Sequence, residues 1–232
     1  MSSGVNGRYR DFALLGRGGM GAVYSAYDTQ RQQPVALKRL LVDANTRHRE
    51  ERVTLFHSEY RTLAELDHPC VIAAYDYGVD AEGPYYTMEL LSGSDLSGNA
   101  RAWREACSLV RDVCSSLALL HSRGYVHSDV SPLNVRCTRD GRAKLIDFGA
   151  LVPMGVSALA VGTPSCIAPE ALAREPLDGR TDLFALGATL YFSLTGQQAF
   201  PARTLLELRA LHLRTPRPPS AIKSDVPPAL DR

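Results

Sequence analysis

A short run rich in serine and glycine, residues 91–98, divides the chain into two parts with different hydropathy patterns. Before it, short runs of aromatic and branched residues predict strands at 9–15, 22–27, 35–41, 71–77 and 84–91. After it, apolar residues recur every three or four positions, which predicts helices. We therefore expect a small sheet-dominated part, a hinge and a larger helical part, and ligands favour the cleft between two such parts.

Helices are predicted at 46–66, 104–121, 182–194 and 204–213. The second of these ends near Gly124, a residue type that favours helix C-termini. Cys107, Cys114 and Leu117 lie on one face of it in the predicted register, so we expect them in the core. The third is almost wholly apolar, which indicates a buried helix. The proline-rich tail at 216–228 predicts an irregular segment over the surface.

Composition narrows the class of protein. The chain has 232 residues, 45% of them hydrophobic, and its 26 basic and 25 acidic side chains give a net charge of +1. This balance indicates neither a nucleic acid nor an anionic membrane as partner. No stretch reaches the roughly 18 apolar residues of a membrane helix, and no secretory signal is evident. Five scattered cysteines predict reduced thiols and a cytoplasmic location. The oligomeric state is not indicated.

A glycine-rich segment at 15–23, LGRGGMGAV, follows the pattern G-x-G-x-x-G-x-V between two predicted strands. Gly16, Gly18 and Gly21 lack a Cβ atom, so their backbone N–H groups can approach phosphate oxygens closely. A strand after the glycines argues against a dinucleotide-binding Rossmann unit, in which a helix follows. By itself the segment fits an ordinary hairpin turn as well as a phosphate-binding loop.

Lys38 lies in the middle of an apolar strand. An unpaired ammonium buried there would cost several kcal/mol or change its pKa sharply. We therefore expect an anionic partner, either Glu59 on the following helix or a bound phosphate. Considered without its neighbours, a lysine whose head reaches the solvent is the commoner arrangement.

Further motifs follow in order: HSDVSPLN at 127–134, DFG at 147–149, Gly-Thr-Pro at 162–164 and APE at 168–170. Together with the two earlier segments they resemble the ordered motif set of protein kinases, and in particular bacterial relatives of eukaryotic serine/threonine kinases. The resemblance implies an α+β, bilobal kinase domain over 9–232. Its N-lobe, about 9–90, has a small antiparallel sheet and one helix; a hinge at about 89–95 leads to a mainly helical C-lobe, about 96–232.

The resemblance implies an enzyme that uses ATP and Mg²⁺ to phosphorylate protein or peptide substrates bearing Ser or Thr. Phosphoryl transfer needs positioning and counter-charge more than covalent chemistry. The implied catalytic residues are Asp129, Lys38, Asn134 and Thr163, with Asp129 accepting the proton of the substrate hydroxyl. Asn134 and Asp147 are the implied Mg²⁺ ligands, since hard oxygens suit that ion.

The implied nucleotide-binding residues are Leu15, Gly16, Gly18, Gly21, Val23, Ala36, Lys38, Glu59, Met88, Glu89 and Leu91. In the family, residues at positions 23 and 36 cover adenine, position 88 is the gatekeeper, and the backbone of 89–91 pairs with adenine. Lys38, aligned by Glu59, would hold the α- and β-phosphates.

Two further sets of residues are implied to support the catalytic ones. His127 and Phe148 are implied to pack beneath the two aspartates. Asp182 resembles the family's aspartate that steadies the catalytic loop, and its position at the start of a predicted helix is also compatible with an N-cap.

Several residues depart from the family pattern. Ser128 stands where many members have an arginine that meets an activation-segment phosphate, so we expect activity not to depend on that phosphorylation. Ser131 replaces a lysine that contacts the γ-phosphate, which predicts a slower enzyme by about one or two powers of ten. Arg136 replaces an apolar residue beneath adenine, although a guanidinium can stack on a purine. The family's last helices, with the arginine that pairs with Glu170, have no counterpart, which predicts a buried, unpaired carboxylate and low stability.

These departures leave two alternatives to an active serine/threonine kinase. A pseudokinase or nucleotide-binding scaffold would explain the loss of charge at 128 and 131, although Lys38, Glu59 and Asp129 remain. A small-molecule phosphotransferase of the aminoglycoside type shares a His-x-Asp loop, but residues 162–170 resemble a peptide-docking segment that such enzymes lack. Tyrosine kinases also lack the lysine at position 131, so Gly162-Thr163 is the feature that favours Ser/Thr.

Overall fold

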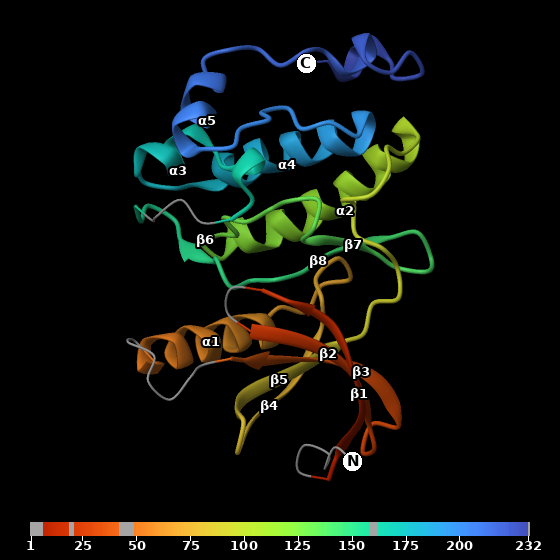
Figure 1. Ribbon diagram of the computed structural model, residues 1–232, viewed down its shortest axis with the longest axis vertical. Coiled ribbons are helices and arrows are strands. Elements are labelled where there is room, and N and C mark those ends of the chain that lie inside the picture. Colours follow the sequence, from red (N-terminus) through yellow and green to blue (C-terminus); the bar gives the residue numbers. More distant parts are fainter. Residues whose placement is uncertain (1–6, 19–20, 42–48, 158–161, 232) are drawn as a thin grey trace. The chain divides into compact units, whose positions relative to one another are not determined.

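The computed structural model describes residues 7–18, 21–41, 49–157 and 162–231 (Figure 1). The chain forms two compact units, residues 1–91 and 92–232. No helix within the described ranges is both long and apolar enough to span a membrane.

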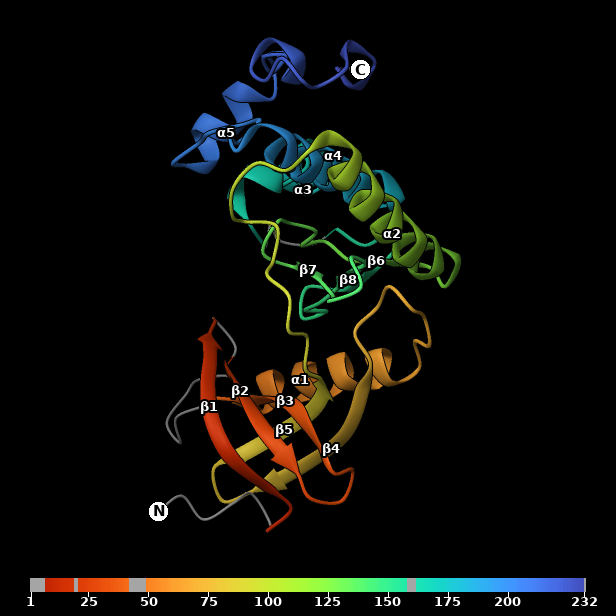
Figure 2. The same cartoon turned by 90° about the vertical axis from the view of Figure 1, so that its right-hand side faces the viewer.

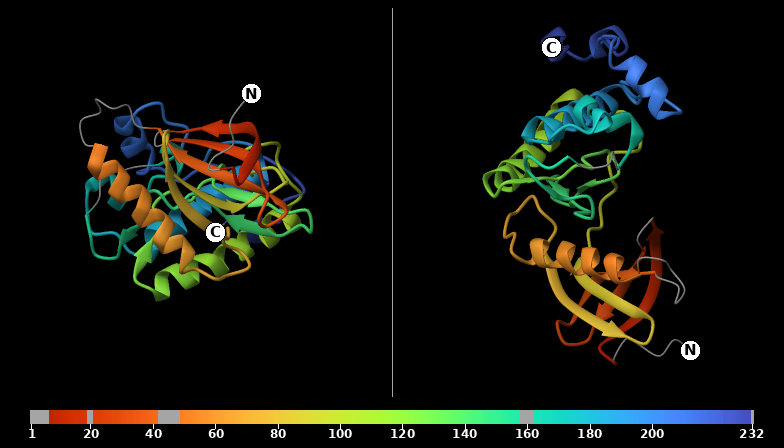
Figure 3. Two further views of the ribbon diagram at one scale, coloured as in Figure 1. Left: turned by 90° about the horizontal axis from the view of Figure 1, so that it is seen from below. Right: turned by 90° about the vertical axis from the view of Figure 1, so that its left-hand side faces the viewer.

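The first unit is an antiparallel sheet of five strands with one helix. The strands are β1 (Tyr9–Arg17), β2 (Gly21–Asp28), β3 (Gln33–Leu40), β4 (Ala74–Asp80) and β5 (Gly83–Glu89), in the spatial order β1-β2-β3-β5-β4. The helix α1 (Arg49–Ala64) packs beside the sheet, as Figures 2 and 3 show. The predicted start of this helix, 46–48, lies outside the described residues.

Alternation along β3 sends its side chains to two different environments, because successive residues of a strand point to opposite faces. Val35 and Leu37 pack with Tyr9, Ala26 and Tyr85 on one face of the sheet. Leu40 packs with Phe56 and Tyr86 on the face that α1 covers. Lys38, two residues before Leu40, therefore points toward α1.

The second unit is mainly helical. Its helices are α2 (Trp103–Ser122), α3 (Pro169–Ala173), α4 (Gly179–Thr195) and α5 (Leu205–Leu211), with short 3-10 turns η1 (Pro164–Cys166), η2 (Pro219–Ala221) and η3 (Pro228–Leu230). Two small antiparallel pairs join β6 (Tyr125–Val126) to β9 (Val152–Pro153) and β7 (Val135–Cys137) to β8 (Ala143–Leu145). Helices α2 and α4 pack against each other (Figure 1). The expected α+β architecture, a sheet with one helix followed by a mainly helical part, is confirmed.

The buried face of α2 differs from the predicted one. Leu109, Val113 and Leu117 are almost fully buried, whereas Cys114 is exposed and Cys107 is half-buried. The prediction that both cysteines are core residues is therefore wrong. Consecutive residues of a helix are about 100° apart, so burial of Val113 turns Cys114 toward solvent.

Helix α4 begins earlier than predicted. Its N-cap is Asp178, whose side chain accepts a hydrogen bond from the backbone N–H of Arg180. The interpretation of Asp182 as an N-cap is therefore wrong, because this residue lies inside the first turn and is fully buried. Leu183 is 53% exposed, so the helix is not buried all round as its composition suggested.

Candidate functional site

Lys38 and Glu59 form a buried ion pair in the first unit. The Lys38 Nζ atom lies 2.7 Å from Glu59 Oε1. Lys38 is 9% exposed and Glu59 is 5% exposed, and β3 and α1 supply one residue each. The structure thus gives the buried ammonium the carboxylate partner that the sequence led us to expect.

Tyr86 on β5 joins this pair and was missed from the sequence. Its hydroxyl donates a hydrogen bond of 2.9 Å to Glu59 Oε1, the oxygen that Lys38 also contacts. The Lys38 ammonium lies 5.9 Å from the centre of the Tyr86 ring, within the range of a cation–π contact. Strand register places the two residues directly opposite each other. The sequence pattern alone does not determine this register, so it could not predict that Tyr86 lies beside Lys38.

Several predicted nucleotide-binding residues share one face of the sheet. Val23 lies opposite Lys38 across the β2–β3 pair, and Met88 lies opposite Ala36 across the β3–β5 pair. Cross-strand partners point to the same face, and residues two apart on β3 do so as well. Val23, Ala36, Lys38 and Met88 therefore lie together on the α1 side of the sheet. Leu15 on β1 is exposed, while Glu89 and Leu91 lie at the end of β5 and just beyond it.

The glycines of the glycine-rich segment differ in how much space a Cβ atom would have. A Cβ atom at Gly21 would lie 2.0 Å from the carbonyl oxygen of Arg39, so close strand packing demands glycine there. A Cβ atom at Gly16 or Gly18 would have no atom of the described residues within 4 Å. The backbone N–H groups of Gly18 and Gly21 donate to each other's carbonyl oxygens, at 2.9 and 3.3 Å. Residues 19–20 of the motif lie outside the described residues.

Asp129 in the second unit is held at both carboxylate oxygens. The Asn134 Nδ2 group donates to Oδ2 at 2.9 Å, and the backbone N–H of Thr163 donates to Oδ1 at 3.0 Å. The Thr163 hydroxyl lies 3.4 Å from the same Oδ1 atom. Burial raises the pKa of Asp129, while hydrogen bonding from Thr163 and Asn134 and the nearby His127 act in the opposite direction.

Gly162 is a second residue that sequence reasoning left without a structural role. Its φ angle is 115°, and a Cβ atom there would lie 2.6 Å from Asp129 Oδ1. Only glycine lets the 162–163 backbone approach the carboxylate this closely. The predicted grouping of Asp129, Asn134 and Thr163 is thus present in space and depends on this glycine.

Asp182 fixes the loop that carries Asp129. Its Oδ2 atom accepts hydrogen bonds from the His127 N–H at 2.9 Å and from His121 Nε2 at 2.8 Å. Its Oδ1 atom accepts the N–H of Ser128 at 2.9 Å, and Ser128 has a φ of 67°. Sequence reasoning missed His121, which lies on α2, far from Asp182 in the sequence. The aspartate steadies the loop as the resemblance implied.

The chain brings Asn134 and Asp147 to neighbouring strand ends. Val135 pairs with Leu145 across β7 and β8, and the N–H of Ile146 donates to the carbonyl oxygen of Asn134 at 2.9 Å. Asp147 is exposed and has a φ of 59°. Within the described ranges no three His, Cys, Asp or Glu side chains gather to hold a metal alone. One carboxylate and one amide suit Mg²⁺, which usually takes remaining oxygens from phosphates and water.

His127 and Phe148 pack against each other beneath these loops. Their ring centres are 5.0 Å apart in an edge-to-face arrangement, and both residues are almost fully buried. The backbone N–H of Asp129 donates to His127 Nδ1 at 3.3 Å. A packing role follows for both residues, because neither ring is exposed to a substrate.

Comparison with known proteins identifies the family. The sequence matches the protein kinase domain family over residues 9–226. The chain belongs to the protein kinase family. It is 34% identical over 245 residues to a probable serine/threonine-protein kinase of Streptomyces coelicolor, covering 98% of this chain and 36% of that protein. It is also 36% identical over 239 residues to the serine/threonine-protein kinase Pkn1 of Myxococcus xanthus, covering 97% and 34%.

A third relative is the serine/threonine-protein kinase PknB of Mycolicibacterium smegmatis, 34% identical over 246 residues, which cover 98% of this chain and 39% of that protein. The kinase domain described here therefore spans a little over a third of the length of these relatives. Members of the family generally use ATP and a divalent metal ion and act on protein substrates.

The structure also shows where the departures from the kinase pattern lie. Ser131 is fully buried, and its hydroxyl finds no hydrogen-bond partner among the described residues. Arg136 is tethered within the second unit, because its Nε group donates to the carbonyl oxygen of Gly93 at 2.9 Å. Ser128 contributes its backbone, not its side chain, to the Asp182 network.

Glu170 of the kinase domain corrects one expectation. It is only half-buried, and its Oε1 atom accepts a hydrogen bond of 2.8 Å from the Thr181 hydroxyl. The expected buried carboxylate without a partner is therefore absent from this position. A partly hydrated, hydrogen-bonded carboxylate costs much less than a buried one, so the low stability inferred from Glu170 loses its basis.

Proposed function

We propose that this kinase domain is catalytically active and transfers the γ-phosphate of ATP to serine and threonine hydroxyls of protein substrates. The observation that carries this proposal is the two-sided grip on Asp129 by Asn134 and Thr163. A carboxylate fixed in this way can accept a hydrogen bond from a substrate hydroxyl in one defined orientation, which is the main requirement for a positioned base.

The environment of Asp129 suits proton acceptance. Burial raises the pKa of this carboxylate above that of an exposed aspartate, which makes it a stronger base. Three polar groups from two segments orient it, as a positioned base requires. We assign Thr163 to the catalytic set because its N–H and hydroxyl both contact Asp129 Oδ1.

Lys38 supplies the positive charge that a triphosphate needs. Its contact with Glu59, and the contact of Glu59 with Tyr86, fix the ammonium at one place on the sheet. We assign the α- and β-phosphates to Lys38, and the backbone of the glycine-rich segment to the same phosphates. Val23, Ala36 and Met88, on the same sheet face, are assigned to adenine.

Asn134 and Asp147 are the residues that would hold Mg²⁺. The Asn134 amide nitrogen donates to both the backbone oxygen and the Oδ2 atom of Asp129, at 2.9 Å each, so its Oδ1 atom is the one suited to a cation. A bound Mg²⁺ would neutralise charge on the phosphate oxygens during transfer. We place the kinase in the cytoplasm, and its five free cysteines support a reducing compartment.

A pseudokinase that binds nucleotide without transferring phosphate is the second candidate. The buried, unpartnered hydroxyl of Ser131 favours it, because this residue brings no charge to the γ-phosphate. The oriented carboxylate of Asp129 argues against it, since a domain that only binds nucleotide has no need of a positioned base.

Labelled ATP with Mg²⁺ and a generic serine-rich protein distinguish the two candidates, alongside a titration of nucleotide binding. An active kinase binds Mg·ATP and leaves label on phosphoserine or phosphothreonine. Nucleotide binding with no transfer to the protein or to the kinase itself would identify a pseudokinase. Label on phosphotyrosine alone would contradict the proposed specificity, and the absence of binding would refute both candidates.

A further inference from the structure

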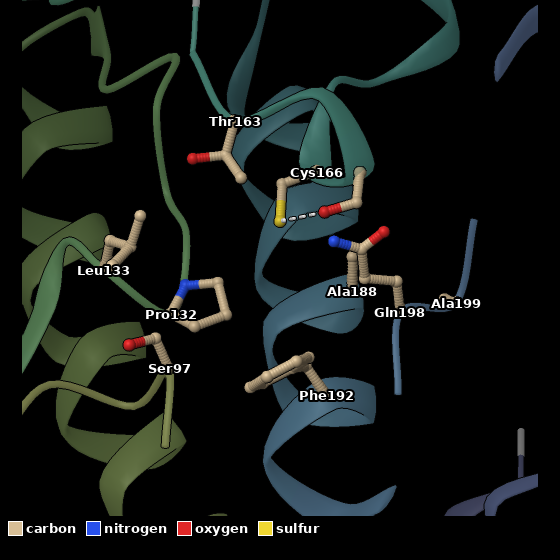
Figure 4. A pocket seen from close by; sticks show the side chains of 10 residues that line it. Ser97, Pro132, Leu133, Thr163, Cys166, Ala188, Phe192, Gln198 and Ala199 are labelled. Atoms are coloured by element: carbon tan, nitrogen blue, oxygen red, sulfur yellow. Dashed lines mark hydrogen bonds between the residues drawn. The ribbon is translucent and has the colours of Figure 1, made fainter. Parts of the chain in front are cut away.

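A small pocket lies in the second unit (Figure 4). Pro132 and Leu133, from the loop that follows Asp129, face Cys166 and Phe192 across it. Thr163 also lines the pocket, and its N–H and hydroxyl contact Asp129 Oδ1. One side chain therefore separates the pocket from the carboxylate that is assigned to the acceptor hydroxyl.

The lining of this pocket is uncharged. None of the described residues that line it carries a charge: Ser97, Pro132, Leu133, Thr163, Ser165, Cys166, Ala188, Phe192, Gln198 and Ala199. Cys166 is buried, which raises the pKa of its thiol and keeps it neutral, and its sulfur lies 3.9 Å from the Ser165 hydroxyl. A charged group placed here would lose hydration without gaining a counter-charge, whereas an apolar group would gain by leaving water.

The size of the pocket indicates its occupant. Its volume is about 150 Å³. Pockets for small-molecule ligands usually measure about 300–1,000 Å³, so this one suits a single side chain. An extended peptide advances about 3.4 Å per residue. A peptide whose hydroxyl meets Asp129 would therefore bring one of its nearby residues over the pocket.

We propose that this pocket binds an uncharged, apolar side chain of the polypeptide substrate, so that the kinase selects acceptor residues flanked by Leu, Met or Phe over those flanked by Lys or Arg. The proposal rests on the proposed function, because it takes Asp129 as the group that meets the acceptor. It adds the substrate class, which neither the motifs nor the relatives specify.

Peptides with one acceptor serine test this selection. Each of the three positions on either side of the serine is made Leu or Arg in turn, and both kcat/KM and binding by fluorescence anisotropy are measured. At one position, kcat/KM for the Leu peptide should exceed kcat/KM for the Arg peptide about ten-fold, as expected when an apolar pocket must accept a charge. Phe192→Ala removes the largest apolar side chain of the lining. It should weaken binding of the Leu peptide and leave binding of the Arg peptide nearly unchanged.

A matched pair of variants isolates the pocket. Gln198→Glu adds a carboxylate to an exposed side chain at the pocket and should lower the Leu-to-Arg ratio about five-fold. Gln197→Glu makes the same change at a neighbouring exposed residue outside the lining and should leave the ratio unaltered.

The outcomes separate this inference from the proposed function. Absence of phosphate transfer would refute the proposed function. The anisotropy measurements would still show whether the pocket prefers an apolar side chain. Equal binding of Leu and Arg peptides at every position, or equal responses of the two glutamate variants, would overturn the inference. Concentration-dependent self-association that Phe192→Ala abolishes, without any peptide discrimination, would assign the pocket to a second copy of the chain and would also overturn it.

Discussion

Tyr86 and Lys38 meet on a single oxygen of Glu59, the tyrosine hydroxyl at 2.9 Å and the lysine ammonium at 2.7 Å. The tyrosine comes from β5, the lysine from β3 and the glutamate from α1, so one carboxylate oxygen joins three elements of the first unit. Packing of the Phe56 ring against Tyr86, with ring centres 5.1 Å apart, strengthens the same junction. The position of the lysine charge is thus fixed by contacts inside this unit.

Tyr86→Phe tests the role of that hydroxyl. The substitution keeps the ring but removes a hydrogen bond to a charged group, worth about 1.5–3 kcal/mol, and we expect kcat/KM for ATP to fall about ten-fold. The same bond contributes to folding, so the melting temperature should also fall by several degrees. Tyr77→Phe is the matched control, because Tyr77 packs in the same aromatic cluster, with its ring centre 6.5 Å from that of Phe56, while Tyr86 is the tyrosine that donates to Glu59. Equal losses in both variants would show that the hydroxyl has no special role.

Asp182→Asn should destabilise the second unit. The substitution replaces one acceptor oxygen with an NH₂ group that faces N–H donors, so at least one buried donor loses its partner. We expect a loss of about 3 kcal/mol in the free energy of unfolding, measured by denaturant titration. Asp178→Asn on the same helix is the control, since asparagine caps helices as well as aspartate does. A loss below that of the control would contradict the assigned role.

The hydrogen bonds of Asp28 predict that the first unit loses stability in acid. Its carboxylate accepts hydrogen bonds from Arg8 at 2.9 and 2.7 Å, and these, with two backbone N–H groups, lower its pKa from 3.8 to about 2. Because the pKa is lower in the folded state, the stabilisation is present above about pH 4 and is lost as the pH falls toward 2.

Asp28→Asn measures this contribution. Arg8 is partly exposed, and solvent screening reduces the effect, so we expect a loss of about 1 kcal/mol at neutral pH that shrinks as the pH falls below about 4. Denaturant titrations across this range provide the measurement. Asp11→Asn, at an exposed residue 3.6 Å from Arg10, should have little effect at any pH. If the stability difference between the natural chain and Asp28→Asn grew on acidification, the assigned role of Asp28 would be contradicted.

Phosphatase treatment tests whether the kinase needs modification. Ser128 replaces the arginine that would bind an activation-segment phosphate, and Thr163 is already engaged with Asp129. Ser165 is 8% exposed, which leaves little room for modification. We expect treated and untreated protein to have equal activity within about two-fold. A large loss on treatment would show that a phosphate is required after all.

The sequence predicted those features that local motifs determine. Asp129, Asn134 and Thr163 come together as the resemblance implied, because a loop of fixed length and one close-packed glycine bring them there. Tyr86 could not be predicted, since its place opposite Lys38 depends on strand register. His121 reaches Asp182 only through the packing of α2 on α4.

The wrong prediction for the buried face of α2 also arises because that face depends on tertiary packing. The face of α2 that is buried depends on its partner α4, whereas periodicity alone predicts a buried Cys114, which is exposed. Periodicity gives the spacing of a helical stripe but tolerates a rotation of one residue when polar and apolar side chains are mixed. Tertiary packing settled which neighbour, Val113 or Cys114, is buried.

Transfer of labelled phosphate from Mg·ATP to protein, compared between the natural chain and Asp129→Asn, tests the central claim most directly. Asparagine is close in shape but cannot accept the proton, so the rate should fall by about two to four powers of ten. The melting temperature and the nucleotide affinity of the variant should stay close to those of the natural chain. Equal rates from the two folded proteins would contradict the account.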